Sequence, residues 1–465
     1  MARSVQRDPG SFRDPLSRVF LADDSVYRGL TAAGLADYEA VAAAPFFGRL
    51  LEERLVVPTT RLPTTSPLDG EWAAVLQHER VKVVSYPYEW SFAMLRDAAL
   101  LQLDVTRRAL GDGFTTKDAT PYNVQFEDLR PVFIDVGSFE PRPADEPWLG
   151  YQQFCELFLN PLVLQAVGNM AFQPWLRGSL DGIRAAEVEP LVRGRKRLDR
   201  GLLVHVVLHA RAERRYADRD RDVRGELRQA GLGPKVIAAQ LDNLARTVAS
   251  LRWSEQSSTW SDYAGRSHYT QSDLAAKEAF VASAVEARRP SLVLDLGAND
   301  GHFSKVALRS GAERVVAVDS DHLTVDRLYR SLREVGEARI LPLVMDVANP
   351  SPGLGWAGRE RGPFTRRVAP ELVLCLAVVH HLALTDTVPF ELVVDFLADF
   401  GADVVVEFPH PDDPMVARLL ARKRAGLFDH YQVADWERAL ESRFAIVRRE
   451  VLPSGRRTMY ACTRR

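Results

Sequence analysis

Residues 292–301 have the sequence Leu-Val-Leu-Asp-Leu-Gly-Ala-Asn-Asp-Gly, and no other segment indicates the fold as clearly. The apolar run at its start is typical of a buried strand, and Gly297 and Gly301 allow the backbone to bend and to approach a ligand closely. Residues 303–308 continue with the periodicity of a helix. A strand, a glycine-rich turn and a helix in this order predict a nucleotide-binding turn in an α/β fold.

A second predicted strand supports this interpretation. Residues 315–318 are apolar and are followed by Asp319. An acidic residue at this point of a doubly wound sheet accepts hydrogen bonds from the hydroxyls of a ribose, so we expect a nucleoside at the carboxyl ends of the strands. The alternative is an ordinary strand-to-helix turn in another α/β protein, which would make the spacing of Asp295, Asp319 and Asp346 coincidental.

The spacing of the glycines argues against a dinucleotide. A turn that binds a pyrophosphate has the pattern Gly-x-Gly-x-x-Gly, whereas this chain has Asp295-x-Gly297-x-Asn299-x-Gly301. The Asp295 carboxylate would repel a pyrophosphate but suits a cationic amino-acid group. The pattern resembles the first motif of class I S-adenosylmethionine-dependent methyltransferases.

This resemblance covers residues 256–465 and implies a Rossmann-like α/β domain with a seven-stranded, mostly parallel sheet. The further strands that we expect lie at residues 343–346, 371–377, 402–407, 445–447 and 458–462. The resemblance implies S-adenosylmethionine as the cofactor, with Asp346, at the end of the third strand, near the adenine amino group. The cofactor-binding residues that it implies are Asp295, Gly297, Asn299, Gly301, Asp319, Asp346 and Leu376.

Residues after the fourth and fifth strands face the transferable methyl group in this fold. The candidates for a catalytic base at these positions are His380, His381, Glu407 and His410. A histidine that is neutral near pH 7 removes a proton from a hydroxyl or a protonated amine. The alternative is a structural histidine that only forms hydrogen bonds. The aromatic segment 255–272 is interpreted either as a lid on the cofactor or as packing between domains.

Residues 115–139 form a second informative cluster. Asp118 and Asn123 lie five positions apart in a predicted loop, and a predicted hairpin at 124–134 then leads to Asp135. Phosphotransferases use two aspartates and an asparagine in this order to position a hydroxyl and to hold magnesium on the phosphates of ATP. The cluster resembles the catalytic and metal-binding loops of protein-kinase-like folds, most closely the aminoglycoside and choline kinase type. Asn123 and Asp135 would hold the magnesium ion of Mg-ATP.

The kinase resemblance implies an α+β domain before the methyltransferase domain, with lobes at residues 1–90 and 91–255. We expect strands at 17–21 and 25–28, a strand at 81–89 that runs into a hinge, and helices at 91–110, 148–167 and 201–229. Residues 1–60 lack Gly-x-Gly-x-x-Gly, and no lysine precedes Lys82, so an arginine such as Arg28 would have to replace the usual phosphate-pairing lysine. The alternative is a degenerate kinase-like domain that presents a substrate.

Composition limits the function classes. The chain has 465 residues, of which 46% are hydrophobic and 26% charged, as in folded globular proteins of more than one domain. No apolar run approaches the ~18 residues of a membrane span, the N-terminus lacks the apolar core of a secretion signal, and only three cysteines occur. We therefore expect a cytoplasmic protein. The net charge of −2 makes nucleic acid an unlikely partner.

Taken together, residues 86–90, residues 117–123 and the methyltransferase segment resemble a bacterial group of class I methyltransferases related to a nodulation protein. This resemblance implies methylation of an oxygen or nitrogen on a small-molecule acceptor, such as a sugar or a natural-product intermediate, while the kinase-like domain binds or modifies that acceptor. One alternative is a bifunctional kinase and methyltransferase. Another is a protein or peptide methyltransferase whose first domain is an interaction module.

Overall fold

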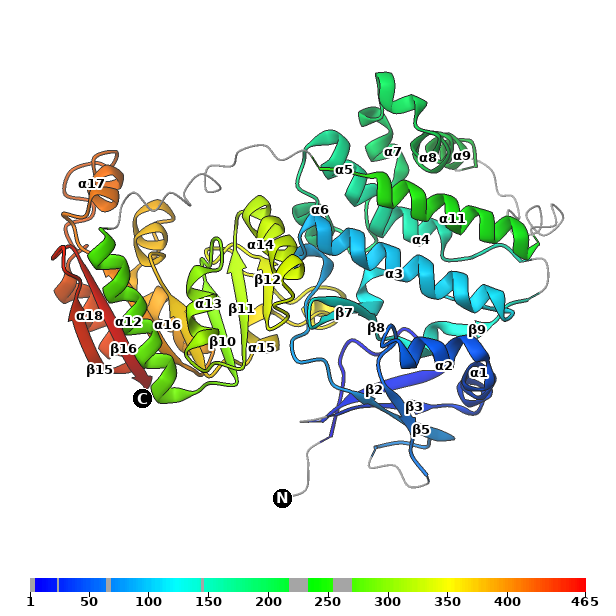
Figure 1. Cartoon of the computed structure of the whole chain (residues 1–465), viewed down its shortest axis with the longest axis horizontal. Coiled ribbons are helices and arrows are strands. Elements are labelled where there is room, and N and C mark those ends of the chain that lie inside the picture. Colours follow the sequence, from blue (N-terminus) through cyan, green and yellow to red (C-terminus); the bar gives the residue numbers. More distant parts are fainter. Residues whose placement is uncertain (1–4, 23–24, 64–67, 144–145, 217–232, 254–269) are drawn as a thin grey trace. The chain divides into compact units, whose positions relative to one another are not determined.

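The chain divides into two compact units in the computed structural model (Figure 1). The first unit comprises residues 1–254 together with residues 354–361, and the second unit comprises residues 255–353 and 362–465. The segment 354–361 thus belongs to the first unit although it comes from the second half of the sequence, which the sequence analysis did not anticipate. The structure describes residues 5–22, 25–63, 68–143, 146–216, 233–253 and 270–465.

The second unit is built on a seven-stranded sheet with the order β12-β11-β10-β13-β14-β16-β15. The five strands β10 to β14 are parallel to one another, and β15 and β16 close the sheet as an antiparallel pair. The predicted mostly parallel sheet is therefore present. The strands are β10 (Leu292–Leu296), β11 (Arg314–Asp319), β12 (Ile340–Val344), β13 (Leu372–Cys375), β14 (Asp403–Pro409), β15 (Phe444–Val451) and β16 (Arg457–Arg464).

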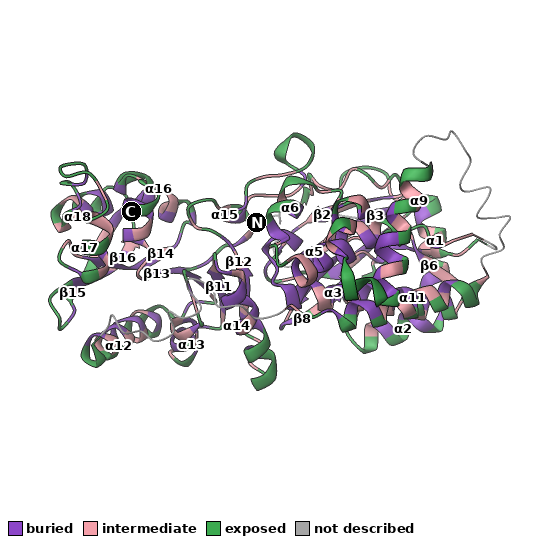
Figure 2. Cartoon of the chain, turned by 90° about the horizontal axis from the view of Figure 1, so that it is seen from above, coloured by how far each residue is buried: buried purple, intermediate pink, exposed green. Residues whose placement is uncertain are grey.

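Helices alternate with these strands, and the central strands are buried along almost their whole length (Figure 2). A parallel strand that is covered on both faces is a nearly continuous apolar run, which explains why β10 and β13 were recognisable in the sequence. The helices are α12 (Gln271–Arg288), α13 (His302–Arg309), α14 (His322–Val335), α15 (Phe364–Arg367), α16 (Phe390–Asp399), α17 (Pro414–Leu420) and α18 (Val433–Glu441).

The third strand begins and ends earlier than predicted. It spans Ile340–Val344 rather than 343–346, so Asp346 follows the strand instead of ending it. Pro342 made the start of the strand difficult to recognise in the sequence, since proline cannot donate a hydrogen bond within a sheet. Strand β12 is at the edge of the sheet, where proline is tolerated.

The first unit contains a five-stranded antiparallel sheet with the order β1-β2-β3-β5-β4 and a helical part. The predicted strands at 17–21 and 25–28 are confirmed by β2 and β3. The elements of this part are β1 (Gln6–Arg7), β2 (Ser17–Leu21), β3 (Ser25–Leu30), α1 (Ala32–Ala43), α2 (Pro45–Glu52), β4 (Thr59–Arg61) and β5 (Ala74–Glu79).

The predicted strand at 81–89 is wrong, because the strand that precedes this region is β5 and residues 87–89 form a 3₁₀ turn. The side chain of Gln125 forms the two backbone hydrogen bonds that a neighbouring strand would otherwise form. Its Oε1 accepts from the backbone N–H of Ser85 at 2.9 Å, and its Nε2 donates to the Ser85 carbonyl at 2.9 Å. The backbone of Ser85 is thus satisfied without strand pairing.

The predicted helix at 91–110 is confirmed by α3 (Phe92–Gly111), which the Ser91 side chain caps. Helices occur as predicted at 148–167, and at 201–229 as far as Tyr216, beyond which the prediction lies outside the described residues. The predicted hairpin is formed by β7 (Val124–Glu127) and β8 (Arg130–Phe133). The other elements are β6 (Phe114–Thr116), β9 (Phe139–Pro141), α4 (Tyr151–Phe154), α5 (Asn160–Gly168), α6 (Gln173–Gly178), α7 (Ala185–Val188), α8 (Arg200–Leu202), α9 (His209–Tyr216) and α11 (Pro234–Ser250).

Within the described part of the chain, we find no helix with the length and hydropathy needed to cross a membrane. The predicted aromatic lid at 255–272 lies outside the described residues except for its last three positions.

Candidate functional site

A cavity of about 370 Å³ opens in the second unit at the carboxyl ends of β10, β11 and β13. Parallel strands bring their carboxyl ends to one edge of the sheet, where ligands bind in open α/β folds. The structure brings seven of the predicted site residues together on the wall of this cavity. They are Asp295, Gly297, Asn299, Asp319, Asp346, Leu376 and His381.

The glycine-rich turn has a backbone that only glycine fits at two positions. Gly297 has a φ of +73°, and a Cβ atom there would lie 2.6 Å from Cγ2 of Val378. Gly301 has a φ of +74°, and a Cβ atom there would lie 2.8 Å from Cδ1 of Leu328. Gly297 lines the cavity, whereas Gly301 is the N-cap residue of α13 and is not part of the cavity wall.

Asp319 ties the glycine-rich turn to the end of β11. The backbone N–H of Asn299 donates to its Oδ2 at 2.9 Å, and the N–H of Asp321 donates to its Oδ1 at 2.9 Å. Burial raises the pKa of Asp319, while these backbone hydrogen bonds lower it in part. The carboxylate is therefore held in one orientation at the cavity wall.

Asp295 is buried beneath the turn. The hydroxyl of Ser304 donates to its Oδ2 at 2.6 Å. Burial raises the pKa of Asp295 to about 6, although the Ser304 hydrogen bond opposes this shift. Asp346 is exposed instead, and its Oδ1 accepts from the N–H of Ala348 at 2.9 Å.

Among the four predicted bases, His381 is the one on the cavity wall. Burial, and then the charge of Arg457, lower the pKa of His381, so its imidazole is neutral at pH 7. His380 packs behind it with a ring-to-ring distance of 4.1 Å and is buried. The ring of His410 is hydrogen bonded to the hydroxyl of Thr458 at 2.7 Å.

Glu407 is enclosed by two cations rather than open to the cavity. Its Oε2 lies 2.6 Å from Nζ of Lys277, and its Oε1 lies 3.0 Å from Nη1 of Arg457. Burial raises the pKa of Glu407, but the charges of these two side chains lower it to about 2. A carboxylate that is ionised and paired in this way is a poor proton acceptor, which argues against the predicted role of Glu407 as a base.

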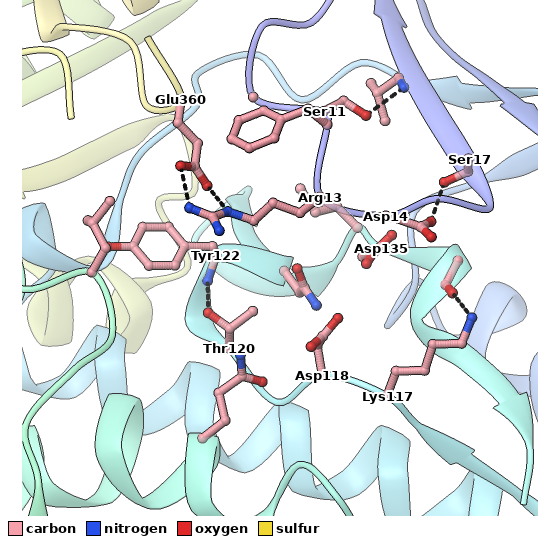
Figure 3. Close-up of a pocket in the computed structure, with 18 of the residues that line it drawn as sticks. Ser11, Arg13, Asp14, Ser17, Lys117, Asp118, Thr120, Tyr122, Asp135 and Glu360 are labelled. Atoms are coloured by element: carbon pink, nitrogen blue, oxygen red, sulfur yellow. Dashed lines mark hydrogen bonds and ion pairs between the residues drawn. The ribbon is translucent and has the colours of Figure 1, made fainter. Parts of the chain in front are cut away.

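The first unit contains a larger cavity, of about 990 Å³. The predicted residues Asp118, Asn123 and Asp135 all line it, so the structure brings them together as well. Figure 3 shows Asp118 and Asp135 among the residues around this cavity. Partial burial, and then the charge of Asp135, raise the pKa of Asp118. On β3, Arg28 places Nη2 at 2.7 Å from Oδ1 of Asp135.

The segment 354–361 supplies part of the wall of this cavity. Glu360 accepts two hydrogen bonds from Arg13, from Nε at 2.8 Å and from Nη2 at 2.9 Å (Figure 3). The Arg361 guanidinium lies 4.4 Å from the ring centroid of Tyr122. The first unit therefore has a complete cavity only with residues from a distant part of the sequence.

Comparison with known proteins identifies the family. No family model matches the chain. Nodulation protein NoeA from Rhizobium meliloti (strain 1021) is 36% identical to it over 462 residues, which cover 98% of this chain and 96% of NoeA. The chain belongs to the NoeA family.

Solved structures are similar to part of this NoeA family member. Magnesium protoporphyrin IX methyltransferase ChlM from Synechocystis PCC 6803, with bound SAH, is 18% identical and covers 46% of this chain and 91% of its own, with a TM-score of 0.31. N-methyltransferase NodS from Bradyrhizobium japonicum WM9, in complex with S-adenosyl-L-homocysteine, is 11% identical and covers 44% of this chain and 98% of its own, with a TM-score of 0.32.

One of the predicted magnesium ligands of the NoeA family member already has a cation beside it. The Arg28 guanidinium pairs with Oδ1 of Asp135 and would compete with a magnesium ion for that oxygen.

Lys277 is a cavity residue that the sequence analysis missed. It lies on α12 outside any motif, and its side chain is buried. One signal in the sequence could have found it: Lys277 occupies the apolar stripe of the helix, four residues before Val281 and eight before Val285. A lysine on a buried helix face needs a partner of opposite charge, and Glu407 is that partner.

Proposed function

We propose that this NoeA family member is an S-adenosylmethionine-dependent methyltransferase that modifies an oxygen or nitrogen of a small molecule, such as a sugar or a natural-product intermediate. One observation carries the proposal: the glycine-rich turn, Asp319, Asp346 and His381 line a single cavity at the carboxyl ends of parallel strands. Gly297 and His381, which are 84 positions apart in the sequence, thus line the same cavity, and this supports the proposal.

The residues of the cavity fit the proposed cofactor. The volume of about 370 Å³ is within the range of ~300–1,000 Å³ that small-molecule sites have. Asp319 accepts hydrogen bonds from ribose hydroxyls, and the side chains of Met345, Leu376 and Val378 supply an apolar wall for the adenine. The Asp295 carboxylate suits the ammonium group at the other end of the cofactor.

The bound cofactor supplies an electrophilic methyl group on a sulfonium. The chain has to align the acceptor with that group and, for a hydroxyl or an ammonium acceptor, to remove a proton. His381 takes this role, because it lines the cavity and is neutral at pH 7. A His381→Ala variant that binds S-adenosylhomocysteine normally but transfers no methyl group would support the assignment.

Calorimetric titration with S-adenosylhomocysteine tests the cofactor site. Asp319→Ala should weaken binding by about 1–3 kcal/mol, because it removes charge-assisted hydrogen bonds to the ribose. Asp399→Ala is the matched control, since Asp399 is exposed on α16 and does not line the cavity. Unchanged affinity in Asp319→Ala would refute the placement of the cofactor.

In this proposal, the cavity of the first unit binds the acceptor. Its cavity of about 990 Å³ has room for a small molecule with several polar groups, and Asp118 supplies a hydrogen-bond acceptor on the wall. The convergence of Asp118, Asn123 and Asp135 favours phosphoryl transfer as a second candidate function, although the Arg28 ion pair opposes a metal ion there. Titration with Mg-ATP, with Asp135→Ala as the control, separates these two candidates.

A further inference from the structure

The cavity of the second unit is rich in acidic side chains. The aspartates on its wall are Asp295, Asp300, Asp319, Asp346 and Asp386. Lys277 is the single lysine or arginine among the described residues that line this cavity. S-adenosylmethionine carries a carboxylate at its amino-acid end, and that carboxylate needs a cation or a set of donors in such a site.

Lys277 lies at the glycine-rich end of the cavity. Its Nζ is 4.5 Å from the ring centroid of Phe303, which is the second residue of the helix that follows the turn. The charge of Lys277 also acts on Asp295 and lowers the pKa of that carboxyl in part. Lys277 and Asp295 line the same cavity, so a cation and a carboxyl group are both present on its wall.

A series of buried ion pairs holds the side chain of Lys277 in place. Nζ of Lys277 contacts Glu407, Nη1 of Arg457 contacts the other oxygen of Glu407 at 3.0 Å, and Nε of Arg457 lies 2.7 Å from Oδ2 of Asp413. All four side chains are at most 4% exposed. Apolar side chains of similar size are often as stabilising as such a buried network. This argues that the network serves to hold the Lys277 ammonium at the cavity wall.

We propose that Lys277 binds the carboxylate of the amino-acid end of S-adenosylmethionine, whose ammonium group the proposed function already assigns to Asp295. This inference rests on the proposed function, since it concerns the same cavity. The amino-acid end is a zwitterion and needs one partner of each sign, which these two side chains provide. A lysine ammonium has three donors, so it can contact Glu407 and a ligand carboxylate together.

Two ligands that differ at the amino-acid end test the proposal on the full-length protein. S-adenosylhomocysteine has the carboxylate, whereas methylthioadenosine has the same adenosine and thioether without it. In calorimetric titrations, Lys277→Met should weaken S-adenosylhomocysteine roughly ten- to a hundredfold and change methylthioadenosine by less than about twofold. Lys277→Arg, which keeps the charge, should recover part of the lost affinity.

Lys235→Met is the matched control. Lys235 is exposed on α11 and does not line the cavity, so this variant carries the same substitution without touching the ligand or the buried network. It should bind both ligands as the unmodified protein does. Retained binding of methylthioadenosine shows that the Lys277 variants are folded. The ratio of the S-adenosylhomocysteine affinity to the methylthioadenosine affinity then shows whether Lys277 binds the carboxylate.

Two results would overturn the inference. One is an equal loss of both ligands in Lys277→Met, while Lys277→Arg is unaffected, which would make Lys277 a structural residue. The other is unchanged S-adenosylhomocysteine affinity in Lys277→Met. Failure of the unmodified protein to bind either ligand is a different result, because it would refute the proposed function itself.

Discussion

The two units place the charges around their cavities in different ways. In the second unit, Glu407 and Arg457 are buried behind the cavity wall, with side chains that are 0% and 4% exposed. In the first unit, the ion pairs are part of the wall itself, and in the Arg13–Glu360 pair the Arg13 side chain is 69% exposed while that of Glu360 is 3% exposed. The Arg28–Asp135 pair, with exposures of 10% and 24%, lies between these extremes.

This difference indicates how each cavity recognises a ligand. Charges that are buried behind a wall cannot exchange partners with water, so they fix the geometry before the ligand enters. Ion pairs inside a cavity have to open or change partners when a charged ligand binds. This difference agrees with the proposed function, in which the second unit binds one invariant cofactor and the first unit binds an acceptor whose groups would replace existing contacts.

The largest effect is expected when the buried network of the second unit is broken. Arg457→Met removes the guanidinium that pairs with both Asp413 and Glu407. Removing one partner from a buried ion-pair network should lower the free energy of unfolding by about 3–5 kcal/mol. Urea denaturation of the full chain measures this loss.

An exposed ion pair of the same unit is the control for this prediction. Asp395→Asn removes the partner of Arg443, which lies 2.6 Å away with both side chains well exposed. This change should alter the free energy of unfolding by less than about 0.5 kcal/mol. Similar losses in Arg457→Met and Asp395→Asn would contradict the distinction between buried and exposed charges.

A smaller effect with the opposite sign is expected at Asp295. Its pKa is raised from 3.8 to about 6 by burial, so the ionised form costs stability. The cost is absent below the unfolded pKa, grows as the pH rises from 3.8 to about 6, and is complete above that value. Asp295→Asn should therefore raise the free energy of unfolding by about 1–3 kcal/mol at neutral pH.

The pH dependence checks this explanation. Denaturation at about pH 4.5 and about pH 7.5 should show the smaller gain at the lower pH. S-adenosylhomocysteine should bind the Asp295→Asn variant more weakly, since the neutral amide loses the charge that attracts its ammonium. A gain of equal size at both pH values would mean that packing, and not the titration of Asp295, is responsible.

Local patterns explain what could be predicted from the sequence. The apolar runs of β10 and β13 and the glycines at 297 and 301 are properties of neighbouring residues, and the structure has these elements where they were expected. Asp118, Asn123 and Asp135 are also close in the sequence, and they share a cavity. Spacing along the chain carries such information directly.

Contacts between distant residues explain what was missed. The apolar stripe of α12 marks Lys277 as buried, but its pairing depends on Glu407, which is 130 positions away. The predicted strand at 81–89 failed because a side chain 40 positions away binds its backbone. Residues 354–361 join the first unit through contacts such as that between Arg13 and Glu360, which are 347 positions apart. No short pattern in the sequence contains such pairs.

The smallest effect is expected at the ion pair that joins residues 354–361 to the first cavity. Arg13→Gln should lower the free energy of unfolding by about 1 kcal/mol or less, because the Arg13 side chain is 69% exposed, although that of Glu360 is only 3% exposed. Glu360 also keeps a hydrogen bond from the N–H of Trp356 at 3.2 Å and a contact with Arg361 at 3.6 Å. Arg61→Gln, at the exposed pair with Glu39, is the control and should have a similarly small effect. A loss above about 2 kcal/mol in Arg13→Gln alone would show that this pair is as strongly coupled as the buried network, and the contrast between the two cavities would then fail.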